Sequence, residues 1–353
     1  MNFLFITKTS WKEPPRARHQ LARSLAKKNH QVVFVAMSSL GIPRCSQTQV
    51  EENILLVQPF WFMNPKLLYR IPIANELFQM WLFQNLSRKY EDFNVINFDP
   101  SASLLYRYLP NYVFYCNDDF TDKKRAKFFI SQSYFKMTQK IVARKANFCV
   151  AVSAYLKEQI AQYNPNTHLI LTAAGKVREG SVFPQEKSDI INAVYVGWLS
   201  KINIKWVLSL ARNPKIRITL IGPANVSQSK SFAGVDNIEL RGELVGEELF
   251  CALDKADVCL APYEFGRDTN EVYTVPNKFW LYLSCGKPVV TARINRLHPF
   301  PSKMVYQSND CIEFENNVIG AVEEDTRELF DKRKRFIKNN DWSTRVDELL
   351  SHY

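Results

Sequence analysis

The sequence has no cysteines spaced as C-x-x-C, no long apolar run, no low-complexity tract and no internal repeat. Its seven cysteines are an odd, scattered set, which argues against a disulfide scaffold or zinc ribbon and predicts a reducing compartment. A spanning helix needs about 20 apolar residues, so the chain is predicted not to cross a membrane. The opening segment Asn2–Thr7 lacks the basic leader of a signal peptide and is expected to form a strand.

The chain of 353 residues exceeds the roughly 250–300 residues at which a single hydrophobic core stops growing, which predicts two domains. Hydrophobic residues make up 46% and charged residues 23%, a composition that excludes a disordered protein. The net charge of +11 is uneven. Residues 1–185 hold 24 basic and 12 acidic side chains, whereas residues 186–353 hold 22 and 23. This asymmetry predicts two halves with different partners.

Short apolar runs alternate with amphipathic helical patterns in both halves, and a polar stretch at Gly175–Ser188 has the composition of a linker. Continuous apolar runs such as Tyr112–Cys116 are typical of strands that are buried on both faces of a parallel sheet. The pattern therefore predicts two doubly wound α/β domains, whose ligands bind at the carboxyl ends of the strands.

The segment Val275–Val290 carries the clearest chemical signal. Pro276 at a helix start leaves free backbone N–H groups and a positive dipole end, and Lys278 adds a cation one turn into the helix. Gly286 ends that helix before the next strand. A diphosphate is the ligand that fits this arrangement, although any α/β crossover has a helix start and a terminal glycine.

Val275–Val290 resembles the P-x-K…Y-L-x-x-G-K-P-V-V segment of GT-B glycosyltransferases. Six further segments resemble other motifs of that family: Tyr195–Ser200, Leu220–Pro223, Leu240–Leu244, Ala256–Tyr263, Tyr115–Phe120 and Phe148–Ser153, with Asn340–Val346 as the start of the closing helix. The resemblance implies two Rossmann-like domains that face a central cleft. It divides the chain into an acceptor domain (1–180), a nucleotide-sugar domain (181–325) and C-terminal helices (326–353) that return to the first domain. Within the family, the pattern is closest to the membrane-associated glucuronosyltransferase of xanthan synthesis.

Two departures from the family pattern stand out. Many retaining members carry E-x₇-E, and this chain has Thr274 and Leu281 at those positions. Leu281 cannot hydrogen-bond a ribose hydroxyl. The glucuronosyltransferase type also lacks the acid pair and keeps the lysine. For the reaction, we favour inversion at the anomeric carbon. The first loop, Lys8–Gln20, lacks the glycines that many relatives carry there.

The resemblance assigns donor contacts to the glycine of the opening loop, to a strand end that meets the base, and to the diphosphate site. These residues are Gly197, Glu243, Leu244, Tyr263, Asn277 and Lys278. Two of these assignments have structural alternatives: Glu243 could be an ordinary solvent-exposed loop acid, and Tyr263 could be an aromatic residue packed in the core. Lys278 and the helix N–H groups can stabilise a leaving diphosphate without a metal, and no D-x-D motif is evident, so no cofactor or metal is expected.

Asp118 and Asp119 follow the strand Tyr112–Cys116, where two adjacent carboxylates can raise the pKa of one and make it a better base. We slightly prefer Asp119 as the base; either acid can instead cap a helix. His19, near a helix start, is the rival candidate for the base, and the alternative is that it has only a structural role there. Arg16 and Arg18 in the same turn are candidates for binding an anionic acceptor or the phosphates, or form a solvated basic turn.

The segments Gln58–Met63 and Lys66–Ile71 interleave aromatic and basic residues, a pattern that suits a membrane interface. The alternative is that the aromatics belong to the core.

The sequence thus predicts a glycosyltransferase that moves a sugar from a UDP-sugar to a lipid-linked saccharide in cell-surface polysaccharide synthesis. It would act in the cytoplasm, peripherally on the anionic inner face of the cell membrane. A non-catalytic sugar-nucleotide-binding relative is an alternative, and a nucleic-acid binder is disfavoured because no such motif is present.

Overall fold

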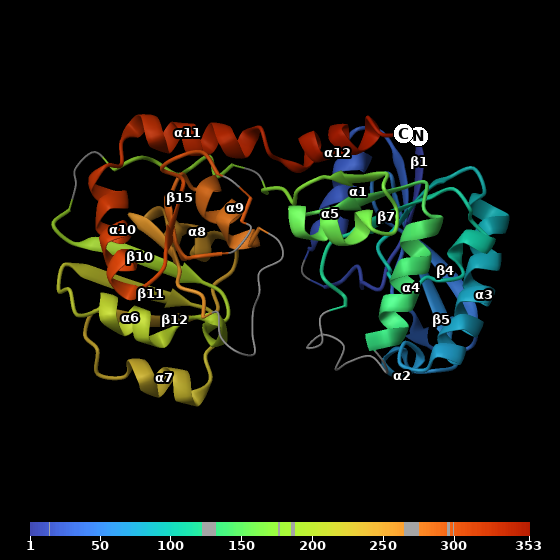
Figure 1. Cartoon of the computed structure of the whole chain (residues 1–353), viewed down its shortest axis with the longest axis horizontal. Coiled ribbons are helices and arrows are strands. Elements are labelled where there is room, and N and C mark those ends of the chain that lie inside the picture. Colours follow the sequence, from blue (N-terminus) through green and yellow to red (C-terminus); the bar gives the residue numbers. More distant parts are fainter. Residues whose placement is uncertain are drawn as a thin grey trace. The chain divides into compact units, whose positions relative to one another are not determined.

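The computed structural model describes residues 1–13, 15–121, 132–175, 177–184, 188–264, 275–294, 297–298 and 300–353. The chain forms two compact units (Figure 1). The first unit combines Met1–Thr172 with Trp342–Tyr353, and the second is Ala173–Asp341. Each unit is built on its own mainly parallel sheet with helices, which confirms the predicted α/β class with two doubly wound domains.

The sheet of the first unit has the strand order β3-β5-β2-β1-β6-β7-β8-β9, and β4 pairs with β5 as its only antiparallel neighbour among the described strands. Its strands are β1 (Asn2–Ile6), β2 (Gln31–Val35), β3 (Ser39–Leu40), β4 (Arg44–Glu51), β5 (Ile54–Trp61), β6 (Asn94–Asn97), β7 (Tyr112–Cys116), β8 (Phe148–Ala151) and β9 (Thr167–Leu169). Its helices are α1 (Ala17–Lys27), α2 (Pro65–Leu68), α3 (Pro72–Tyr90), α4 (Gln132–Lys145), α5 (Ala154–Ala161) and α12 (Trp342–Leu350).

The order in which strands are added to this sheet reverses between β1 and β6, which run parallel. β1 pairs with β2 on one side and with β6 on the other, with Ile6 opposite Val35 and Asn97. In open α/β sheets the crevice at such a switch point, outside the carboxyl ends of the strands, is where ligands bind. The loops that follow β1 and β6 therefore line the expected ligand edge of the first unit.

The second unit has a fully parallel sheet among its described strands, in the order β12-β11-β10-β13-β14-β15. These strands are β10 (Ile191–Val196), β11 (Ile216–Ile221), β12 (Ile238–Gly242), β13 (Val258–Ala261), β14 (Val289–Ala292) and β15 (Val305–Ser308). The helices are α6 (Ile204–Leu210), α7 (Val226–Phe232), α8 (Gly246–Asp254), α9 (Asn277–Ser284), α10 (Cys311–Glu323) and α11 (Arg327–Lys338). Every residue of β13 and β14 is buried, as the continuous apolar runs predicted.

The two C-terminal helices belong to different units. α11 contacts α9 in the second unit, and its Phe330 and Ile337 are buried. α12 contacts α1 in the first unit, where Val346 and Leu349 join the core. Among the described helices, none is both long and apolar enough to cross a bilayer.

In the segment Gln58–Met63, which the sequence suggested for a membrane interface, neighbouring aromatic residues differ in burial. β5 extends through Trp61, and that side chain packs in the core of the first unit. Phe62, the next residue, is exposed. Phe62 lies just beyond the strand, and its ring stacks on that of Trp61 with centroids 4.5 Å apart, so it covers the core residue from outside. The membrane prediction was therefore wrong for Trp61, whereas Phe62 is free to make an outer contact.

Candidate functional site

Two glycines form the floor of a site at the carboxyl ends of β10 and β11. Gly197 follows β10 with φ +136°, and Gly222 follows β11 with φ +138°. A Cβ on Gly222 would lie 2.1 Å from the Gly197 carbonyl oxygen, and a Cβ on Gly197 would lie 2.8 Å from Lys278 Nζ. The backbone oxygen beside Gly222 cannot move away, and the positive φ at both positions is strained for any residue with a side chain, so the loop requires glycine at both.

The Lys278 ammonium occupies the space that a side chain at position 197 would fill. It lies 3.9 Å from the centre of the Tyr195 ring and 5.0 Å from that of Tyr263. Burial, reinforced by the charge of Lys201, lowers the pKa of Lys278 well below its usual value. No described acidic side chain forms an ion pair with it. A cation held in this way gains strongly from an anionic ligand.

The first turn of α9 adds to this positive field. Pro276 precedes the helix, Asn277 is its first residue and is exposed, and no acid occupies the first turn. The free N–H groups and the positive end of the helix dipole make such a terminus an anion site. Tyr282, one turn later, fixes the helix to the sheet. It accepts a hydrogen bond from the Val196 N–H (2.7 Å) and donates one to the Leu260 carbonyl (3.3 Å).

The remaining predicted donor residues follow the same strand edge. Tyr263 follows β13 and is almost fully buried, and its ring also lies close to the Lys278 ammonium. It therefore packs in the core and lines the expected donor site at the same time. Glu243 is exposed and Leu244 half-buried just after Gly242, whose carbonyl accepts a hydrogen bond from the Gly222 N–H. Leu281 packs against the core of the second unit, and Thr274 lies outside the described residues.

In the first unit, the two adjacent acids have different surroundings. Asp119 is only 7% exposed, and its Oδ1 accepts hydrogen bonds from the N–H and the hydroxyl of Thr121, both at 2.8 Å. The Tyr155 hydroxyl donates to its Oδ2 at 3.2 Å. Asp118 is partly exposed and accepts the Asp119 N–H on one oxygen. The structure thus assigns Asp119 a role in fixing the loop and leaves Asp118 the more accessible carboxylate.

His19 is fully buried, and both of its ring nitrogens are engaged. Nδ1 accepts a hydrogen bond from the Arg16 N–H at 3.0 Å, and Nε2 lies 3.1 Å from the Ser10 carbonyl, so Nε2 carries the proton. The ring stacks on Phe34 with centroids 5.2 Å apart, and burial lowers its pKa. This arrangement corrects the reading of His19 as a rival base, because neither nitrogen is available to receive a proton from a substrate.

The two arginines of this turn also differ. Arg16 is well exposed and pairs with Glu13 at 2.8 Å. Arg18 is buried. Within the described residues, no group of three or more His, Cys, Asp or Glu side chains is placed to hold a metal ion, and metal independence stays a prediction.

Comparison with known families accounts for both units. Residues 17–172 match the model described as Glycosyltransferase Family 4, and residues 191–331 match Glycosyl transferases group 1. The chain is a glycosyltransferase. No curated protein matches it over its sequence.

Solved structures show the same fold over the whole length of the glycosyltransferase. The apo form of the lipopolysaccharide outer core galactosyltransferase WaaB is 14% identical, with a TM-score of 0.69 and 100% of both chains covered. HepE from Anabaena, in complex with UDP and glucose, is 14% identical with a TM-score of 0.63, covering 99% of this chain and 98% of its own. An E. coli protein bound with UDP-2-fluoro glucose is 10% identical with a TM-score of 0.71, covering 100% and 98%. At these identities the likeness establishes the GT-B fold alone.

Lys201 is the residue of this glycosyltransferase's second unit that the sequence reasoning missed. It lies in the short 3₁₀ turn Leu199–Lys201 that follows Gly197, and its charge acts on Lys278. A single exposed lysine in a turn has no pattern of its own. Its position four residues after the loop glycine was the available signal.

Proposed function

We propose that this glycosyltransferase transfers a sugar from a UDP-sugar to a lipid-linked saccharide. The observation that carries the proposal is Lys278, which has no acidic partner among the described residues and lies in the first turn of α9, beside a loop floor that only glycine can form. Lys201, in the turn after Gly197, adds a second positive charge that acts on Lys278. A nucleotide diphosphate supplies the missing negative charge and can approach the Gly197 backbone closely. The UDP bound to HepE and the UDP-2-fluoro glucose bound to the E. coli neighbour support this donor class.

The same charges favour a reaction that needs no metal. As the bond between the sugar and the diphosphate breaks, negative charge grows on the leaving UDP. Lys278 and the α9 N–H groups are already oriented toward an anion and stabilise that charge without rearranging. On the acceptor side, we propose that Asp118 takes the proton of the attacking hydroxyl, which would invert the anomeric carbon.

The nucleotide can be tested by thermal unfolding of the full chain with UDP, GDP, ADP or CMP, in buffer that contains EDTA. UDP is expected to give the largest rise in melting temperature, because a ligand that binds only the folded state stabilises it, by about 2.7 kcal/mol at 100 times its Kd. A larger rise with another nucleotide would contradict the UDP assignment. Stabilisation that required added Mg²⁺ or Mn²⁺ would contradict metal independence.

An exposed apolar face on α2 and α3 supports a membrane-bound acceptor. Ile73, Leu77 and Met80 are spaced at i, i+4 and i+7 along α3, and the exposed fraction of Ile73 is 72%. Phe62, Leu67 and Ile71 are exposed in the segments just before α3. α3 also buries its opposite side in the core, so this face has no described protein partner.

Lys66 and Arg70 are exposed within this apolar face, which gives it the composition of an interfacial surface for anionic lipid. The basic surplus of residues 1–185 acts in the same direction. We therefore propose that the first unit docks on the inner face of the cell membrane through α2 and α3. The motifs of the sequence favour a lipid-linked acceptor of the exopolysaccharide type, and WaaB is named as a lipopolysaccharide outer core galactosyltransferase.

The double variant Ile73→Glu/Leu77→Glu is expected to abolish binding to vesicles that contain anionic lipid. Both side chains are exposed, so the fold should be retained while an apolar contact becomes a repulsive one. Co-sedimentation of wild type should also weaken as salt rises, because each basic residue near the surface contributes about 1 kcal/mol that salt screens. Exposed Val226 on α7 of the second unit provides the matched control, Val226→Glu. Equal binding of wild type and the double variant would refute this face.

A further inference from the structure

Arg18 is a buried cation without a partner. Its residue is 8% exposed, and its guanidinium makes no hydrogen bond or ion pair with the described part of the chain. The Nε atom is buried with no acceptor. A buried donor without an acceptor is unfavourable, and a ligand that supplies an acceptor to the guanidinium removes that cost.

The acids that act on Arg18 are already engaged by other groups. Glu13 and Asp99 are the acids whose charges act on the guanidinium, and Arg16 adds a repulsive charge. Glu13 pairs with Arg16 through one oxygen and accepts the Ser10 N–H through the other. Asp99 pairs with Lys8 at 3.2 Å. The cations of this region therefore outnumber its acids.

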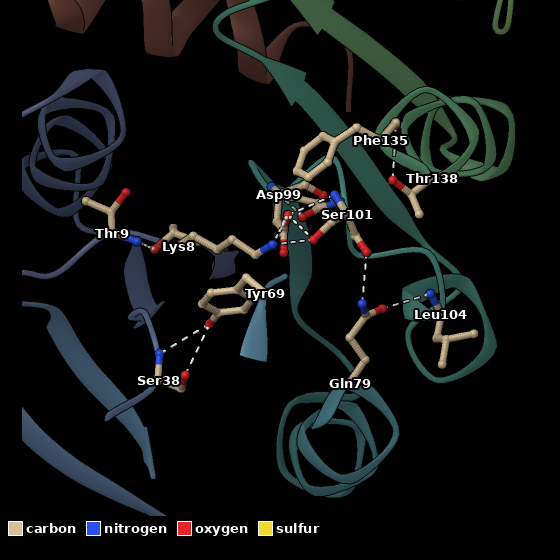
Figure 2. A network of polar contacts seen from close by, with 12 residues as sticks. Lys8, Thr9, Ser38, Tyr69, Gln79, Asp99, Ser101, Leu104, Phe135 and Thr138 are labelled. Atoms are coloured by element: carbon tan, nitrogen blue, oxygen red, sulfur yellow. Dashed lines mark hydrogen bonds and ion pairs between the residues drawn. The ribbon is translucent and has the colours of Figure 1, made fainter. Parts of the chain in front are cut away.

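Lys8 and Asp99 sit in a rigid polar network at the switch point of the first sheet (Figure 2). The Lys8 ammonium contacts the Ser101 hydroxyl and lies 4.1 Å from the centre of the Tyr69 ring. The N–H and hydroxyl of Ser101 donate to Asp99 Oδ1, both at 2.8 Å. Gln79 holds this loop by donating to the Ser101 carbonyl at 2.8 Å. Because the loop is held in this way, Asp99 is not free to turn toward Arg18.

The start of α1 adds backbone donors to the same region. Arg18 is the second residue of α1, no acid occupies the first turn, and the Ala17 and Arg18 N–H groups have no acceptor among the described residues. His19 fixes the turn by accepting the Arg16 N–H. A helix N-terminus together with an unpaired guanidinium binds an oxyanion through charge-assisted hydrogen bonds.

We propose that Arg18 and the first turn of α1 bind an oxyanion of the acceptor substrate, a phosphate or a carboxylate. This inference deepens the proposed function, and rests on it for the identification of the ligand as the acceptor. Two sources carry such a group: the phosphate that links a saccharide to its lipid, and the carboxylate of an acidic sugar. The site would hold the acceptor in register at the ligand edge of the first unit.

The test compares wild type with Arg18→Gln and with Lys27→Gln, a control at the exposed end of the same helix. Thermal unfolding is measured with inorganic phosphate or with glucuronate, in saturating UDP so that the donor site is occupied. We expect one of these anions to raise the melting temperature of wild type and Lys27→Gln and to leave that of Arg18→Gln unchanged. The anion that acts identifies the source.

Without added anion, Arg18→Gln should melt at or above the temperature of wild type, because a cation whose buried Nε–H has no acceptor has been removed. A clear fall in its melting temperature would assign Arg18 a structural role and overturn the proposal, as would equal anion stabilisation of wild type and Arg18→Gln, or none in either. These readouts need no transfer activity, so they stand apart from failure of the proposed reaction. Where transfer is measurable, Arg18→Gln should raise KM for the acceptor at least tenfold and leave KM for the donor unchanged.

Discussion

Replacing Lys278 by alanine is expected to lower the rate of sugar transfer about 10²–10³-fold, the usual loss when one preorganised electrostatic contact to a developing charge is removed. UDP affinity should fall about tenfold or more, because a charge-assisted hydrogen bond contributes about 1.5–3 kcal/mol. The fold should survive, since Lys278 has no acidic partner among the described residues and its burial carries a desolvation cost. Initial rates and calorimetric titration with UDP measure the two effects.

Lys205→Ala is the matched control, because Lys205 is an exposed lysine of α6 in the same unit. Gly197→Ala tests the position of the Lys278 ammonium independently. Its Cβ would fall 2.8 Å from Lys278 Nζ, so it should displace the ammonium and weaken UDP binding with the lysine still present. Near-normal turnover and UDP affinity in Lys278→Ala would remove the residue from the donor site.

The second large effect is expected at Asp118. Asp118→Asn should lower transfer by the 10²–10⁴-fold typical of a lost general base, with little change in UDP affinity because the carboxylate belongs to the other unit. Asparagine retains the shape and can still accept the Asp119 N–H, so the local structure should persist. Rates under saturating donor and UDP titration separate the two quantities.

Asp119→Asn is the neighbouring comparison. Its amide oxygen can still accept from Thr121, and its NH₂ group can donate to the Tyr155 hydroxyl oxygen in place of accepting from it, so transfer should stay within a few-fold of wild type. The anomeric configuration of the product, read by NMR, is an independent check, since a base on the acceptor side requires inversion. A retained configuration, or full activity in Asp118→Asn, would refute the role of Asp118.

The sequence was sufficient for features that depend on local pattern. Continuous apolar runs predicted strands such as β7, and Pro276 correctly marked the start of α9. The anion site at that helix start stays a prediction. β4 was missed, because a largely exposed strand has no apolar run to reveal it.

The roles of individual polar residues were less predictable, because they depend on contacts between distant segments. Nothing in the sequence around His19 indicates that the Ser10 carbonyl occupies its Nε2. The preference for Asp119 over Asp118 likewise could not anticipate the hydroxyl of Tyr155, 36 residues away. Arg18 differs from Arg16 only in which neighbours each one meets in the folded chain.

The position of α12 has a consequence for how the protein is made. The core of the first unit includes Val346 and Leu349, which the ribosome adds only after all of Ala173–Asp341 has been synthesised. The second unit is thus an insertion within the first, and it can finish folding while the first still lacks a helix. Until α12 arrives, the surface of α1 that it covers stays open to solvent. The nascent first unit is therefore exposed to aggregation during translation for longer than the second unit.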